Sequence, residues 1–187
     1  MGEVKIKGTA LSSAQRYTLE RFGEDGWRMV LDGLTPEDRQ QVERGVLVSA
    51  WYPFSLFIQI VRLLETRFGG QVPRLHREMG RAAAEYGLTS FYKIFFKVGS
   101  PQFIISKAAK VWRTYNSSGE MTAPVCEKGH AVIELAGFAE PAPELCERLP
   151  GFFERTGELS GGRDVKVVHP LCVNRGDATC RFEAWWT

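Results

Sequence analysis

Residues near the C-terminal end of this sequence carry side chains that bind metals in many proteins. His169, Cys172 and Cys180 lie within the stretch HPLCVNRGDATCRFEAWW. The two cysteines are equidistant from Gly176, so a hairpin that turns there would place their thiols opposite each other. Thiolates and imidazole suit Zn(II), and Cys146 on a preceding helix would complete a Cys3His set. A disulfide, or cysteines buried simply as small hydrophobic side chains, are the two alternatives.

The position of His169 depends on the regularity of its strand. His169 stands three residues before Cys172, so a regular strand would place the two side chains on opposite faces. Pro170 interrupts such regularity, and an irregular corner could turn the imidazole back toward the thiols. Whether His169 joins the thiols in one metal site therefore depends on the local backbone geometry at Pro170.

Other chemistry-bearing residues favour structural interpretations. Cys126 and His130, in CEKGH, span an expected tight turn, and a turn histidine beside a half-buried cysteine is favoured over a metal site. We expect His76 on a helix surface. The sequence contains no P-loop, no GxGxxG after a strand, no HExxH and no GxSxG, so we predict no catalytic residue.

Length, charge and cysteine usage limit the class of protein. The 187 residues fit one domain, 1–187, and a formal net charge of +2 argues against a nucleic-acid partner. The first residues, MGEVKIKGTALSS, lack the apolar segment of a secretory signal, so we expect a cytoplasmic protein with reduced cysteines. The longest charge-free run, 45–61, contains Pro53 and is too short for a membrane span; a buried strand followed by a helix explains it better.

Periodicity and turn residues predict an α+β fold. Residues 4–11 indicate a short strand that leads into a helix over 14–34, broken at Gly23 or Gly26, and Thr35 would cap a polar helix over 36–45. Helical spacing continues through 57–70 and 72–87, then through an aromatic stretch over 91–116. The later part predicts a strand pair over 125–139, a helix over 142–162 and a final hairpin. We therefore expect a helical N-terminal part packed on a mostly antiparallel sheet.

Aromatic side chains on the predicted helices suggest an apolar pocket for a small aromatic or lipid-like molecule. The alternative is that these aromatic residues fill the core or a dimer interface. The candidate ligand-binding residues are Trp51, Phe54, Phe57, Phe91, Phe95, Phe103 and Trp112.

The C-terminal motif resembles the signature of 4-vinyl-reductase-type domains: an acidic residue or His, two spacers, Cys, a GD-containing turn, then CRFE. In the related aromatic-sensing domains of XylR-like and phenol-responsive regulators, zinc is held by a Cys on the last helix, a Glu and two hairpin Cys. This resemblance implies zinc at Cys146, His169, Cys172 and Cys180, with His169 standing where that family has Glu.

The other end of the chain, KGTALSSAQRYTLERFGEDGWRMVL, resembles the opening of haem nitric-oxide/oxygen-binding (H-NOX) domains. These domains share a ligand-binding fold with the 4-vinyl-reductase type and with TRAPP-type trafficking subunits. More loosely, Trp51-Tyr52-Pro53 resembles a feature of an uncharacterised myxobacterial family. The resemblances imply an H-NOX/4-vinyl-reductase-like fold.

The H-NOX resemblance also raises the question of haem. Those domains hold haem through a histidine on a helix just before the sheet, and residues 102–116 contain none. No Tyr-Ser-Arg motif for the haem carboxylates follows. We therefore expect haem to be disfavoured, with Tyr115, Cys126 or His130 as the unconventional ligands that would be left.

These observations lead to one principal functional hypothesis. We expect a cytoplasmic sensory domain that binds a small aromatic or lipid-like molecule, supported by zinc, without His-ligated haem and without catalysis. A homodimer is the expected assembly. The alternatives are a dimeric protein-interaction adaptor, and an enzyme that reduces the vinyl group of a tetrapyrrole.

Overall fold

The first half of the chain is mainly helical. The computed structural model describes residues 2–91 and 100–187, and for residues 88–91 it describes the backbone alone. A short antiparallel strand pair, with Ile6 opposite Tyr52, joins the start of this half to its middle. The elements here are β1 (Lys5–Lys7), α1 (Gly8–Leu31), α2 (Pro36–Glu43), β2 (Trp51–Pro53), α3 (Phe54–Phe68) and α4 (Leu75–Phe91).

A helix cap and a helix break in this half are both found where the sequence predicted them. The Thr35 side chain accepts a hydrogen bond from the backbone N–H of Asp38, so Thr35 caps α2 with Pro36 in its first turn. Gly23 interrupts α1 with φ 70°, a left-handed conformation that costs glycine little. The helix therefore bends at one of the two positions where a break was expected.

The second half contains a four-stranded antiparallel sheet with strand order β3-β4-β6-β5. A β-hairpin forms each half of the sheet, because β3 pairs with β4 and β5 pairs with β6. The elements here are α6 (Pro101–Ile105), α7 (Ala108–Tyr115), β3 (Glu120–Glu127), β4 (His130–Ala136), α8 (Pro143–Leu159), β5 (Lys166–Leu171), the 3₁₀ turn η1 (Val173–Arg175) and β6 (Cys180–Trp185).

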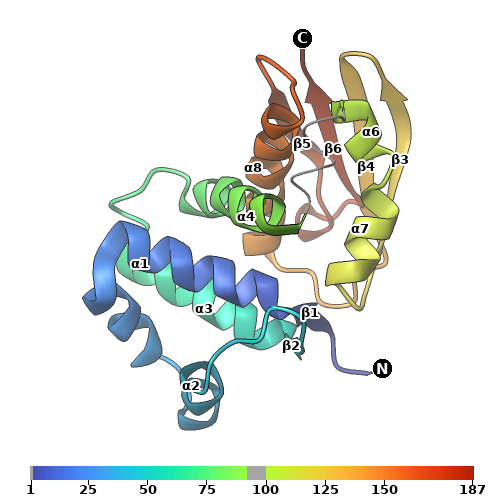
Figure 1. Cartoon of the computed structure of the whole chain (residues 1–187). Coiled ribbons are helices and arrows are strands. Elements are labelled where there is room, and N and C mark those ends of the chain that lie inside the picture. The colour runs from blue at the N-terminus through green and yellow to red at the C-terminus, as the bar shows by residue number, and fades with distance from the viewer. Residues whose placement is uncertain (1, 92–99) are drawn as a thin grey trace.

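Helix α4 connects the two halves (Figure 1). It packs against α1 and α3 on one side and against α8 on the other, while α8 also contacts β5 and β6. Helices α6 and α7 contact β3. The prediction of an α+β fold, with a helical N-terminal part on an antiparallel sheet, is confirmed.

Two glycines allow the backbones of α4 and α8 to approach closely. A Cβ atom added to Gly80 of α4 would lie 2.9 Å from the backbone N of Phe152, and one added to Gly151 of α8 would lie 2.8 Å from the carbonyl carbon of Arg77. Both distances are well below the ordinary carbon contact distance. The crossing therefore depends on the absence of a side chain at these positions.

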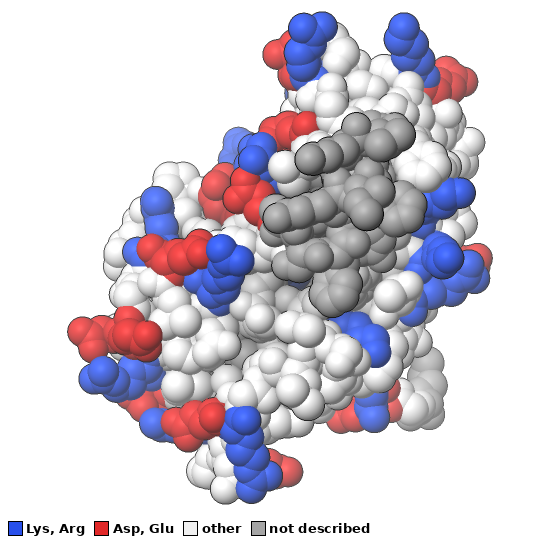
Figure 2. All heavy atoms as spheres, viewed as in Figure 1, with Lys and Arg blue, Asp and Glu red and all other residues white. Residues whose placement is uncertain are grey.

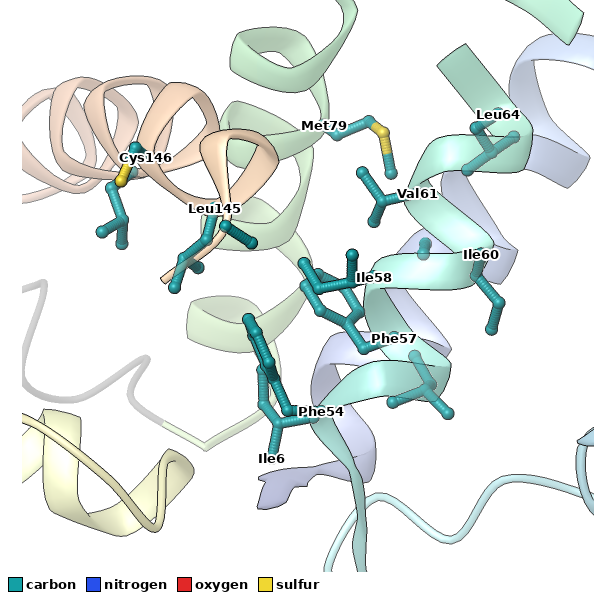
Figure 3. Packing of buried hydrophobic residues seen from close by; sticks show 14 of the residues in the cluster. Ile6, Phe54, Phe57, Ile58, Ile60, Val61, Leu64, Met79, Leu145 and Cys146 are labelled. Atoms are coloured by element: carbon teal, nitrogen blue, oxygen red, sulfur yellow. The ribbon is translucent and has the colours of Figure 1, made fainter. Parts of the chain in front are cut away.

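The hydrophobic core continues from the helical half to the sheet. Phe57 is completely buried, and Figure 3 shows side chains of α3 facing Leu145 of α8. His76 of α4 is also buried, 7% exposed, with Nε2 3.5 Å from Glu65. The expectation that His76 lies on a helix surface is therefore wrong, because α4 is packed between α3 and α8 and has little free surface.

Charged side chains of both signs are interspersed on the face shown in Figure 2. Many are paired, for example Arg39 with Asp32 and Glu43. A broad patch of positive charge, which nucleic-acid binding requires, is not seen on the described part of this face. Within the described residues, no helix is both long and apolar enough to cross a membrane.

Candidate functional site

The structure brings the four predicted metal ligands together. Cys146 comes from α8, His169 from β5, Cys172 from the residue after β5, and Cys180 from the start of β6. One potential ligand atom from each of the four lies within 4.8 Å of the others. The three cysteines are buried and none forms a disulfide. The disulfide alternative therefore does not describe this structure.

A β-bulge accounts for the position of His169. Val168 pairs with Glu183 and Leu171 with Arg181, so two residues of β5 oppose one residue of β6. The extra residue turns the imidazole to the side of the sheet that carries the thiols. His169 also stacks on the ring of Phe182, with centroids 4.2 Å apart. This is the irregular corner at Pro170 on which the sequence prediction depended.

One sulfur–sulfur distance within this cluster is close to that of a tetrahedral zinc site. A Zn–S bond of about 2.3 Å in a tetrahedron separates two sulfur ligands by about 3.8 Å. The Sγ atoms of Cys146 and Cys180 are 3.6 Å apart. Nε2 of His169 is buried and has no hydrogen-bond partner. A metal ion would give this orphaned nitrogen a partner.

The surroundings of the cluster favour a thiolate at Cys180 but not at Cys146, whose pKa is raised by its hydrogen bond with Cys180 and by burial. A hydrogen bond from Cys146 lowers the pKa of Cys180, and His169 acts in the same direction. The amide of Asn174 donates to Cys146 Sγ at 3.2 Å. The carboxylate of Asp177 accepts the backbone N–H of Cys172 at 2.7 Å and fixes the turn. A stabilised thiolate is the form that binds zinc.

Cys126 and His130 lie apart from the cluster. Cys126 Sγ contacts the carbonyl oxygen of Gln102 at 3.4 Å, and the imidazole of His130 stacks on Trp185. Among the described residues, the one group of at least three potential ligands is the cluster of Cys146 and its partners. Cys126 and His130 are therefore not part of this cluster.

An apolar cavity of about 520 Å³ lies between the helices and the sheet. Its size is that of a small-molecule site, and its walls are contributed by α1, α4, α6, α7, α8 and the sheet. Residues that line it include Ala10, Ser13, Ala83, Phe103, Trp112, Tyr115, Met121, Ile133, Leu145, Arg148, Leu149, Phe153, Ala184 and Trp186.

The predicted ligand-binding residues divide into four groups. Phe103 and Trp112 line the cavity. Phe54 and Phe57 lie in the core and are not among the lining residues, while Trp51 is 41% exposed beneath the ammonium group of Lys7. The side chain of Phe91 and the whole of Phe95 lie outside the described residues.

Sequence reasoning missed Arg148, which also lines the cavity. It lies on the same face of α8 as Leu145, Leu149 and Phe152, at helical spacings of three and four residues. A charged residue within such an apolar stripe is a visible sequence signal, because this face of a helix normally packs on the core. Its NH2 group donates to Ser13 Oγ at 2.9 Å.

Comparisons with known proteins find solved structures with a similar fold, but no family model and no curated protein with a similar sequence. The chain is similar in structure to an H-NOX protein from S. oneidensis, with TM-score 0.77, 14% identity, and coverage of 97% of this chain and 96% of that one. It is also similar to an H-NOX protein from K. algicida, with TM-score 0.72, 10% identity and 97% coverage of both chains. An oxygen-binding H-NOX domain related to soluble guanylate cyclases gives TM-score 0.69, 13% identity, and coverage of 97% and 95%.

These structures support the H-NOX part of the sequence resemblance at the level of fold. The names of the 4-vinyl-reductase, XylR, TRAPP and myxobacterial families gain no support from them. Several of the matched structures are described by their Fe(II) state, and one by its heme.

The expectation that haem is disfavoured is contradicted by these matches. The sequence argument considered one histidine position and one motif. The apolar cavity of about 520 Å³ is formed by several elements together, so the sequence argument could not take it into account. Within the described lining, Tyr115 offers a phenol oxygen, a known type of haem ligand.

Proposed function

We propose that this chain is a sensory domain that binds a small hydrophobic molecule, aromatic or lipid-like, in the cavity between its helices and its sheet. The observation that carries the proposal is the cavity itself: about 520 Å³, with walls that are predominantly apolar. A fold shared with ligand-binding H-NOX structures supports it. The cytoplasmic location remains an expectation from the cysteine usage and the first residues of the sequence.

Native mass spectrometry of the reduced, freshly purified protein, compared with its denatured mass, tests this function. We expect a mass excess that is lost on denaturation and that corresponds to a small organic molecule. The same spectrum gives the oligomeric state, for which a homodimer is expected. A native mass equal to the bare chain, with no thermal stabilisation by any hydrophobic compound of a diverse set, would contradict the proposal and favour an interaction adaptor.

Zinc support of one cavity wall is a second part of the proposal. Cys146 is adjacent to Leu145, which lines the cavity, and Cys180 begins β6, whose residue Ala184 also lines it. A zinc ion bound by Cys146, His169 and the two hairpin cysteines would fasten α8 to this wall. We expect a mass excess of one zinc ion, lost in Cys172→Ser and Cys180→Ser.

Cys126→Ser is the matched control for zinc, because Cys126 lies outside the cluster. Its zinc content should equal that of the unchanged protein. Zinc that survives Cys180→Ser, or that disappears in Cys126→Ser, would place the metal elsewhere.

Haem is a second candidate occupant of the cavity, favoured by the haem-containing structures that share the fold. Tyr115 would hold the iron, and the iron would supply binding of a diatomic gas. Haemin added to the purified chain should give an intense visible absorption band that changes in Tyr115→Phe and not in Tyr52→Phe. An unchanged spectrum in Tyr115→Phe would exclude this phenol as the ligand.

A further inference from the structure

A buried arginine without a carboxylate partner lies at the wall of the cavity. Arg148 is 9% exposed and comes from the middle of α8. Both Arg148 and Ser13, which comes from α1, line the cavity. The other two cationic residues of the described lining, Lys107 and Lys110, are exposed, so Arg148 provides the buried positive charge of a site with predominantly apolar walls.

The contacts of Arg148 are few and carry no negative charge. The NH2 group donates to Ser13 Oγ at 2.9 Å, and the guanidinium carbon lies 5.0 Å from the ring centroid of Phe57. The Nε atom is buried without a hydrogen-bond partner. No carboxylate belonging to residues 2–87 or 100–187 forms an ion pair with this guanidinium.

Neighbouring arginines at the α4–α8 interface show the usual arrangement. Arg77 pairs with Glu154, and Arg81 pairs with Glu158. Arg155 of α8 pairs with Glu85 of α4. Arg148 lies two turns before Arg155 on the same helix, and it differs from all three in lacking an acidic partner among the described residues.

An unpaired buried charge is unfavourable, and a guanidinium cannot avoid this cost by losing its proton. Burial lowers the pKa of Arg148 to about 10, so the group is still charged at neutral pH. Buried charges in proteins are normally paired. The Nε–H and the remaining N–H groups form a fork that matches the two oxygens of a carboxylate.

We propose that the cavity takes a ligand with an apolar body and one carboxylate head group, which pairs with the guanidinium of Arg148. The apolar body lies against the wall formed by residues such as Trp112, Ile133 and Leu149. This inference rests on the proposed binding function and specifies its ligand class. An aliphatic acid, an aromatic acid and a carboxylate-bearing haem share this chemistry.

Matched pairs of acid and neutral compounds test the inference. Isothermal titration calorimetry on the full chain compares decanoate with 1-decanol, 2-naphthoate with 2-naphthylmethanol, and haemin with its dimethyl ester. In the unchanged protein the acid of at least one pair should bind roughly 10-fold or more tightly than its neutral partner. The pair that shows this preference identifies the type of apolar body.

Three variants connect the preference to the guanidinium. In Arg148→Met the acid should bind no more tightly than its neutral partner, because its carboxylate is left unpaired, whereas Arg148→Lys should retain part of the preference because it keeps the charge. Arg44→Met removes an exposed arginine far from the cavity and should change nothing. The comparison of acid and neutral compounds in the unchanged protein is informative even if Arg148→Met does not fold.

The outcomes separate this inference from the proposed function. Equal binding of acid and neutral compounds by the unchanged protein refutes the anionic ligand but leaves a hydrophobic binding site. A preference for acids that persists in Arg148→Met assigns the head group to another residue and also overturns the inference. Binding of none of the six compounds, together with a bare native mass, contradicts both.

Discussion

Replacing Gly151 by alanine should force α4 and α8 apart. The new Cβ would lie 2.8 Å from the carbonyl carbon of Arg77, whereas non-bonded carbon atoms rest about 3.5–4.0 Å apart. The two helices must therefore separate by about 1 Å. A gap of that size removes a quarter to a half of the dispersion energy of the atoms that face it.

The free-energy change can be approximated from two opposing effects. Overpacking costs about 1–3 kcal/mol, or more where backbone must move, while alanine gains about 1 kcal/mol over glycine in helix propensity. The Cβ of residue 151 would overlap the carbonyl group of Arg77, which is backbone and cannot rotate away. We therefore expect the upper end of the resulting range, a net loss of about 2 kcal/mol in the free energy of unfolding. For a chain of this length the melting temperature should fall by about 4–8 °C.

Thermal unfolding followed by circular dichroism measures this change, and the chain offers two matched comparisons. Gly80→Ala places a Cβ 2.9 Å from the backbone N of Phe152 at the same crossing, so it should destabilise similarly. The double variant should lose less than the sum of the two, because one separation of the helices relieves both overlaps.

Gly87→Ala, also on α4, is the control, because no described atom lies within 4 Å of the added Cβ. It should leave the melting temperature unchanged or raise it slightly. If Gly151→Ala and Gly80→Ala behave like Gly87→Ala, the close backbone approach is absent and the reasoning fails.

The remaining predictions concern charge, metal and pH. Arg148→Met should increase the free energy of unfolding of the ligand-free chain by about 1 kcal/mol and so raise its melting temperature, because removal of an unpaired buried charge outweighs the lost contacts with Ser13 and Phe57. A clear fall in the melting temperature, measured by calorimetry, would show that the guanidinium is paired. Chelation of zinc should lower the melting temperature of the unchanged protein but not of Cys180→Ser, and acidification should release the metal as protons compete for its ligands; equal effects on both proteins would contradict the assigned cluster. Burial raises the pKa of Glu158, but hydrogen bonds from Arg155 and Arg81 outweigh it, so the pKa lies below its ordinary value. Because the folded-state pKa is depressed, the stability that Glu158 contributes is present above about pH 4.5 and is lost as pH falls further. Unfolding of Glu158→Gln should therefore depend less steeply on pH below this value, and parallel curves for the two proteins would argue against the assignment.

Features that depend on neighbouring residues were predictable from the sequence. The cap at Thr35 and the bend at Gly23 follow from the conformational preferences of single residues. The final hairpin follows from the symmetry of Cys172 and Cys180 about Gly176, and the α+β class follows from the change in periodicity along the chain. In each case the interacting atoms are a few residues apart, so the sequence itself contains the signal.

Features that depend on distant residues required the tertiary structure. Ser13 and Arg148 are 135 positions apart and meet only because α1 and α8 line the same cavity. The bulge at His169 depends on the pairing of β5 with β6, and the burial of His76 depends on helices packed on both sides of α4. The same holds for the question of haem, because enclosure of an apolar volume is a property of several elements together. Side-chain types along the sequence determined which chemistry was available, and long-range packing decided which of those side chains share a site.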